Sequence, residues 1–216
     1  MKNKNRLSNT DVSANKNGFI YPFLKFLIDK SKYLNLVELF KYIAKYMVSE
    51  NNKISASRIA VDVFIVLKWL FIIIIWCFNY SNMFVSILVW YLIITNIYTY
   101  FYYHIWSDEA LKTDNFTKDI IRRRFVNLII AFAYSILCFA YLFQFVYSSD
   151  IDWNSKNIAF INSIMFSFNN SLGSSYNNII PQTDLGNFIC SIELLITFIF
   201  ATLILSRSIP QTDSKK

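Results

Sequence analysis

The densest group of side chains that could coordinate a cation lies in FSFNNSLGSSYNNIIPQTDLG, Phe166–Gly186. Uncharged amide and hydroxyl oxygens can replace part of an ion's hydration shell and still release the ion, so this chemistry suits weak, exchangeable cation binding. The stretch has two parts. A group at the end of a predicted short helix, formed by Asn169, Asn170 and Ser171, precedes a loop of Leu172, Gly173, Ser174, Ser175, Tyr176, Asn177 and Asn178.

A short apolar segment, NIAFINSIMFSF at Asn157–Phe168, leads into this polar stretch. Its pattern predicts a helix that is too short to cross a bilayer. An ordinary surface loop would need no apolar helix before it. Non-helical backbone at membrane depth persists only where it is buried in protein or lines water. The sequence therefore predicts a re-entrant helix and loop.

Two charged residues lie in apolar surroundings. Lys68 falls midway along an apolar run, where a charge is costly, and it is interpreted as part of a gating or intersubunit ion pair, with Asp62 or Glu193 as the candidate partner. The alternative is that Lys68 only reaches toward the membrane surface, or that the span is shifted. Glu193 follows the polar loop, where an acid can either pin the loop or concentrate cations.

Other reactive residues predict no chemistry. Cys77, Cys138 and Cys190 are far apart in apolar runs and are interpreted as small membrane hydrophobes. His104 has no ligand partner at metal spacing. The sequence contains no phosphate loop, nucleophile elbow or paired catalytic carboxylates, so we expect neither an enzyme nor a cofactor.

The composition of the chain indicates a membrane protein. Hydrophobic residues make up 55% of the 216 residues and aromatic residues 19%, whereas only 16% are charged and only 3 are glycine. The net charge of +7 does not indicate nucleic-acid binding, because the basic residues flank apolar segments instead of forming a patch.

Four segments are long enough to cross a bilayer as helices, which requires about 20 mostly apolar residues. They are Ile59–Tyr80, Met83–Trp106, Val126–Tyr147 and Phe188–Leu205, and Tyr80–Asn82 joins the first two as a hairpin. Basic residues precede the first span, separate the second from the third and follow the fourth. We therefore expect a multi-pass protein of the cell membrane with both termini in the cytoplasm.

Ahead of the first span, YLNLVELFKYIAKYMVSE predicts an amphipathic helix with a basic polar face. Two placements stay open: on the anionic inner leaflet, or against a partner helix. The polar residues of this helix are Asn35, Glu38, Lys41, Lys45 and Ser49.

The chain from about residue 120 to 208 resembles the tetrameric potassium-channel superfamily in its helix–pore-loop–helix form. Members read like F-S-F-x-T-x-T-T-V-G-Y-G-D-I-x-P-x-T-x-L-G, and this sequence keeps the frame without a gap. Glu193 stands where many members carry an acid early in the inner helix. The matching positions are Phe166, Ser167, Phe168, Tyr176, Ile179, Pro181, Thr183, Leu185 and Gly186.

The filter itself departs from the family pattern, because Leu172–Asn178 reads LGSSYNN in place of T-T-V-G-Y-G-D. Asn177 could adopt the left-handed conformation of a filter glycine at modest cost, whereas Ser175 could not. Gly173 offers no hydroxyl, and Asn178 removes an acidic ring. Thr197 replaces the glycine at which many members bend the inner helix. The resemblance thus implies a pore, but not strong potassium selectivity.

These patterns predict an all-α integral membrane protein with four transmembrane helices, a re-entrant pore helix and loop between the third and fourth, and an amphipathic interfacial helix in front. The segments are a disordered 1–17, interfacial helices 18–55, a transmembrane hairpin 56–106, a cytoplasmic linker 107–124, a channel domain 125–208 and a tail 209–216.

The leading functional hypothesis is a homotetrameric channel that passes monovalent cations with weak selectivity, with membrane lipids, above all the anionic inner leaflet, as its other partner and no nucleic acid. One alternative is a channel-like membrane scaffold that does not conduct. Another is an effector pore that depolarises the membrane.

Overall fold

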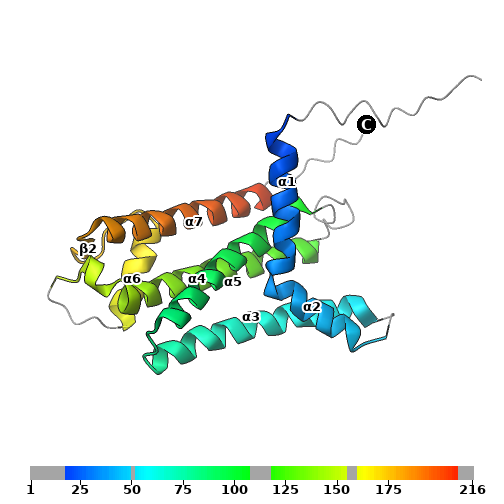
Figure 1. Cartoon of the computed structure of the whole chain (residues 1–216), viewed down its shortest axis with the longest axis horizontal. Helices are drawn as coiled ribbons and strands as arrows, with labels where there is room; N and C mark the ends of the chain where they lie inside the picture. Colours follow the sequence, from blue (N-terminus) through cyan, green and yellow to red (C-terminus); the bar gives the residue numbers. More distant parts are fainter. Residues whose placement is uncertain (1–17, 50–51, 108–117, 155–159, 209–216) are drawn as a thin grey trace, which may run out of the picture.

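The computed structural model describes residues 18–49, 52–107, 118–154 and 160–208 (Figure 1). The predicted disordered segment 1–17, the tail 209–216, most of the linker 107–124 and the first three residues of the predicted short helix lie outside these residues.

Four long helices form the body of the molecule: α3 Lys53–Cys77, α4 Met83–Phe101, α5 Lys118–Tyr141 and α7 Asp184–Ser208. A π-helical segment extends α4 through Tyr102–Trp106, and another extends α5 through Leu142–Val146. Each of the four contains a stretch long and apolar enough to cross a membrane, in agreement with the four predicted spans. The chain is therefore mostly helical and has the features of a multi-pass membrane protein.

The long helices alternate in direction. The start of α3, the end of α4, the start of α5 and the end of α7 lie at one end of the bundle, which is also where α1 and α2 lie (Figure 1). Asn79, with φ of 51°, ends α3 in the left-handed conformation, and the side chain of Asn82 caps α4 by accepting a hydrogen bond from the Val85 amide at 2.8 Å. These two asparagines make the hairpin connection that the sequence predicted.

Helix α5 is the centre of the bundle, because it contacts α3, α4, α6 and α7. Of its membrane-length stretch, 56% is buried inside the chain, against 33% for each of the other three. Large aromatic side chains fill this centre, and the fully buried ones are Tyr134, Phe139, Tyr141, Phe143 and Phe200.

The short helix α6, Phe160–Ser171, packs beside α5 and α7 at the end of the bundle opposite α1 (Figure 1). Two short strands bracket it, β1 Ile151–Asp152 and β2 Ile180–Pro181, which pair antiparallel with Ile151 opposite Pro181. A single 3₁₀ turn, Ser148–Asp150, precedes β1. This ladder fastens the end of the polar loop to the chain that leaves α5, and it adds a small strand pair to the predicted all-helical fold.

The N-terminal region forms two helices, α1 Ile20–Ser31 and α2 Leu36–Tyr46, joined by a 3₁₀ turn Lys32–Leu34. Helix α1 runs crosswise to the long helices, whereas α2 lies beside α3, with the rings of Phe40 and Phe64 5.3 Å apart (Figure 1).

Candidate functional site

Helix α6 ends in a Schellman motif at Gly173. The Gly173 amide donates to the Asn170 carbonyl at 2.9 Å and the Ser174 amide to the Asn169 carbonyl at 2.8 Å, with Gly173 at φ of +70°. Asn169–Ser171 therefore form the last turn of the helix, at the helix end to which the sequence assigned them. The resemblance to the channel family presented Gly173 as the loss of a threonine hydroxyl, whereas in the structure Gly173 provides the left-handed residue that ends α6.

We expect Gly173→Ala to lower the free energy of unfolding by about 1 kcal/mol, because an L-residue in the left-handed region costs roughly 1–2 kcal/mol. Space is not limiting, since a Cβ at Gly173 would have no neighbour within 4 Å. Gly173→Asn should be milder because asparagine tolerates this conformation. Thermal unfolding in detergent measures both variants, and equal losses for alanine and asparagine would contradict the assignment.

Glu193 is buried in the interface between α6 and α7, with 1% of its surface exposed. Its carboxylate accepts hydrogen bonds from the Ser167 hydroxyl and from the Asn170 amide, the latter at 2.6 Å. Asn170 also donates to the Cys190 carbonyl at 3.1 Å. Of the two roles predicted for Glu193, this geometry is that of a pin between the short helix and α7.

Phe166 and Ser167 fix α6 against the rest of the chain. Phe166 is buried, and its ring lies 5.0 Å from that of Phe143 and 5.8 Å from that of Trp153. The Ser167 hydroxyl lies between two acceptors, the Ile136 carbonyl on α5 at 2.8 Å and Glu193, which share its single proton. Phe168, in contrast, is 44% exposed. The first two residues of the FSF frame thus anchor α6 within the chain, and the third does not.

The loop reverses direction at Asn177 and Asn178. Both have positive φ, 52° and 56°, and the Ile179 amide donates to the Tyr176 carbonyl at 2.9 Å, which makes a two-residue turn of the I′ kind. Asn177 adopts the left-handed conformation that the sequence left open to it, and Asn178 shares it. A tight reversal here is incompatible with the extended row of carbonyls that a potassium filter needs over the same residues.

Most of the loop side chains are accessible. Tyr176 is half-buried, and its hydroxyl lies 3.3 Å from Asn162 Oδ1, while Ile179 is buried and fixes the end of the turn. The exposed residues are Leu172, Gly173, Ser174, Ser175, Asn177 and Asn178. The loop therefore presents two hydroxyls and two amides at the end of the bundle.

Asp150 secures the far side of the loop. Its side chain accepts from the Thr183 hydroxyl at 2.7 Å, and its carbonyl accepts from the Gln182 amide at 2.9 Å. Thr183 in turn accepts from the Gly186 amide at 3.0 Å and so caps α7. A Cβ on Gly186 would lie 2.4 Å from the Asp150 carbonyl oxygen, so this close approach explains the glycine.

Lys68 and Thr197 lie away from the loop. Lys68 donates to Asn96 Oδ1 at 2.6 Å, whereas Asp62 pairs with Arg123 at 2.9 Å and Glu193 with α6. Neither predicted partner of Lys68 therefore contacts it within the chain. Thr197 is half-buried, one turn beyond Glu193 on α7.

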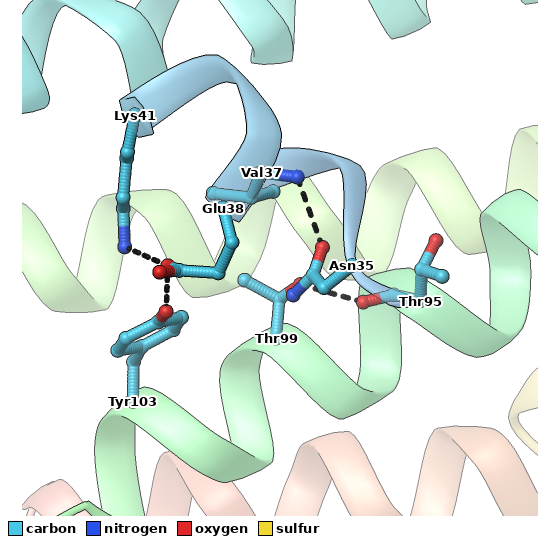
Figure 2. A network of polar contacts seen from close by, with 7 residues as sticks. All are labelled: Asn35, Val37, Glu38, Lys41, Thr95, Thr99 and Tyr103. Carbon is cyan, nitrogen blue, oxygen red and sulfur yellow. Dashed lines mark hydrogen bonds and ion pairs between the residues drawn. The ribbon is translucent and has the colours of Figure 1, made fainter. Parts of the chain in front are cut away.

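A second polar cluster joins α2 to the end of α4 (Figure 2). Asn35 donates to the Thr99 hydroxyl at 2.8 Å, and Glu38 accepts from Lys41 at 2.9 Å and from the Tyr103 hydroxyl. Part of the polar face of α2 therefore contacts the end of α4 in its own chain.

Burial acts to raise the pKa of Glu38, but the hydrogen bonds from Tyr103 and Lys41 outweigh it, so that the pKa lies below its ordinary value. A carboxyl with a depressed pKa in the folded state stabilises above its unfolded pKa, and this contribution disappears as the pH falls through the folded pKa.

We expect Tyr103→Phe to weaken the α2–α4 contact by about 1 kcal/mol at neutral pH, the usual contribution of one hydrogen bond. Hydrogen exchange of α2 should speed up in the variant at pH 7, while wild type and variant should converge under acid conditions that protonate Glu38. A difference that persists undiminished in acid would contradict this role of Glu38.

No family model, no curated protein and no solved structure matches the chain.

Proposed function

We propose that the chain is the subunit of a homotetrameric channel that passes monovalent cations with weak selectivity. The observation that carries the proposal is the short helix α6, which is pinned by a buried acid to α7 and ends in an exposed loop of hydroxyls and amides. Within a membrane, the non-helical backbone of such a loop is tolerated only where it lines water or is buried in protein. In this proposal α6 and its loop enter the membrane from one side and return.

A pore requires an oligomer, because the single loop of one chain cannot enclose a pore and several copies must surround its axis. The number four comes from the resemblance to the tetrameric potassium-channel superfamily. Apolar side chains on α6 and α7 are exposed between 42% and 69% and are available for contacts between copies; they are Met165, Phe168, Leu194, Leu195 and Phe198.

Weak selectivity is supported by the turn at Asn177 and Asn178. Strong potassium selectivity needs successive rings of carbonyls that replace the hydration shell, and a reversed chain offers side-chain oxygens instead. An ion that keeps part of its water is hard to distinguish from another of the same charge. Cations are favoured over anions because the C-terminal end of α6 carries a partial negative charge beside the loop.

In the proposed orientation the protein spans the cell membrane with both termini in the cytoplasm. The end of the bundle that holds α1 and α2 also holds Lys53, Arg58 and the Arg122–Arg124 run, whereas the loop end is poor in basic residues (Figure 1). Basic residues accumulate on the cytoplasmic side of membrane proteins.

Purified chain reconstituted into liposomes tests the proposal. Potassium and sodium should both leave loaded vesicles faster than chloride, and native mass spectrometry in mild detergent should show four copies. Stable tetramers without any cation flux would identify a scaffold and overturn the channel. A stable monomer or dimer would overturn the assembly.

A further inference from the structure

We propose that α1 lies in the interfacial region of an anionic membrane leaflet, with its apolar face toward the acyl chains. This binding surface is separate from the polar loop, and it holds whether or not the chain conducts. We call it the α1 face, and it consists of Phe19, Ile20, Phe23, Leu24, Phe26 and Leu27.

The α1 face is too apolar and too exposed to be left in water. Its six side chains are between 44% and 84% exposed, and α1 itself has no buried residue. On a helical wheel they fall on one broad side, opposite Lys25 and the residues that contact the rest of the chain. A contiguous apolar patch of this kind marks an interaction site.

The attachment of α1 fixes its depth. The Trp106 indole donates to Asp29 at 3.0 Å and the Tyr98 hydroxyl donates to the Ile28 carbonyl at 2.6 Å, so α1 sits at the end of α4. Because α4 is a membrane-length helix, its end coincides with the bilayer surface. Helix α1 also runs crosswise to α4, as a helix lying in the membrane plane must (Figure 1).

The charges around the α1 face favour anionic headgroups. Lys25, Lys30 and Lys32 are basic, and the only acid of α1, Asp29, already accepts from Trp106. The ammonium of Lys30 lies 5.7 Å from the ring of Phe26, so its stem follows the apolar surface and its charge can reach outward. Basic residues close to an anionic membrane surface are attracted to its headgroups.

Helix α2 extends the same surface. Asn35, Glu38 and Lys41 face α4 (Figure 2), and Val37 and Phe40 pack against the chain, but other apolar residues in and just after α2 stay exposed. Five of them are exposed between 48% and 85%: Leu39, Tyr42, Ile43, Tyr46 and Met47. Lipid is the occupant that covers both helices together, since both flank the end of a membrane-length helix.

Spin labels on the full-length chain test this placement. In a Cys77→Ser background, whose remaining cysteines are buried, single cysteines at positions 23 and 27 report the α1 face and one at position 25 reports the opposite side. A cysteine at Val66, which is 56% exposed in the middle of α3, is the control for a lipid-facing site. Accessibility to oxygen and to a water-soluble nickel chelate is then compared in nanodiscs.

We expect labels 23 and 27 to favour oxygen several-fold, like the control, and label 25 to favour nickel. Phosphatidylglycerol added to phosphatidylcholine should move labels 23 and 27 deeper, and replacing Lys25, Lys30 and Lys32 by glutamine should abolish that shift. Nickel access at 23 and 27 would overturn the proposal. Protection from both reagents would also overturn it, because a second copy or another protein would then cover the face. Conduction is not read, so failure here leaves the channel proposal intact.

Discussion

Asn96→Leu is expected to lower the free energy of unfolding by about 3 kcal/mol, because it strands a buried ammonium without its hydrogen-bond acceptor. Lys68 and Asn96 are 6% and 5% exposed, and Lys68 Nζ donates to Asn96 Oδ1 at 2.6 Å. Among the described residues no carboxylate lies within ion-pair distance of Lys68. The ammonium also lies beside the rings of Tyr134 and Tyr100, with Nζ 4.5 Å and 5.9 Å from their centroids.

Asn96 also connects α4 to α5. Its amide donates to the Ala131 carbonyl at 2.9 Å and to the Ser135 hydroxyl at 3.1 Å. Asn96→Leu therefore removes the acceptor of Lys68 and the two hydrogen bonds that Asn96 donates to α5. Lys68→Met should be less destabilising than Asn96→Leu, because it removes the buried charge and leaves only the Asn96 carbonyl oxygen without a partner.

A double-mutant cycle separates the pair from the helix contacts. The variant with both substitutions should be more stable than Asn96→Leu alone, since no ammonium remains to be satisfied. Equilibrium unfolding in mixed micelles, followed by circular dichroism, gives the free energies, with Lys45→Met on the exposed side of α2 as the control. Strictly additive losses would mean that Asn96 does not support Lys68.

Glu193→Ala is expected to have the second large effect and to lower the free energy of unfolding by about 2–3 kcal/mol. Two hydrogen bonds to a buried carboxylate are removed, and interhelical hydrogen bonds within membranes contribute up to roughly 1.7 kcal/mol each. The cavity left by the side chain adds to the loss. Because Ser167 and Asn170 are both on α6, the short helix should also lose its fixed position against α7.

The measurement pairs stability with hydrogen exchange of α6. We expect α6 to exchange faster in Glu193→Ala while α3 and α4 stay protected, and Glu193→Gln, which keeps an acceptor, to lie between the two. Ser191→Ala, an exposed position on α7 whose hydroxyl contacts only the Asn187 carbonyl, is the matched control and should stay within about 0.5 kcal/mol of wild type. Uniformly faster exchange throughout the chain would contradict a pin confined to α6 and α7.

The long helices were predictable because their signal is local. Twenty consecutive apolar residues demand a helix in a membrane whatever surrounds them, and Asn79 and Asn82 mark the first hairpin by their own conformational preferences. The end of α6 carried a similar local signal, since a glycine after a periodic apolar run commonly stops a helix. The helix end was accordingly placed at Asn169–Ser171, but the comparison with the filter pattern treated Gly173 as a missing threonine and overlooked its role as the helix C-cap.

The orientation of α2 could not be predicted, because it depends on residues far along the chain. Glu38 meets Tyr103, 65 residues away, and Asn35 meets Thr99, 64 residues away. An amphipathic pattern shows that a helix has two faces but not which face its own chain will cover. Lys68 is a similar case, since an uncharged partner such as Asn96 gives no signal in a search for opposite charges.

Asn177 and Asn178, at the tip of the loop, were predictable only in part. The sequence indicated only that the left-handed region was accessible to Asn177, but the consequence depends on Asn178 adopting the same conformation, because two consecutive residues of this kind reverse the chain. One left-handed residue is compatible with a filter, whereas the pair makes a turn.

The reversal potential of single channels under bi-ionic conditions tests the central claim most directly. With potassium on one side of a planar bilayer and sodium on the other, we predict discrete currents that reverse close to zero voltage, because a loop that turns at Asn177 and Asn178 leaves water on the ion. A potassium-to-sodium permeability ratio of about 100 would contradict the account, since it requires an ordered stack of carbonyl rings.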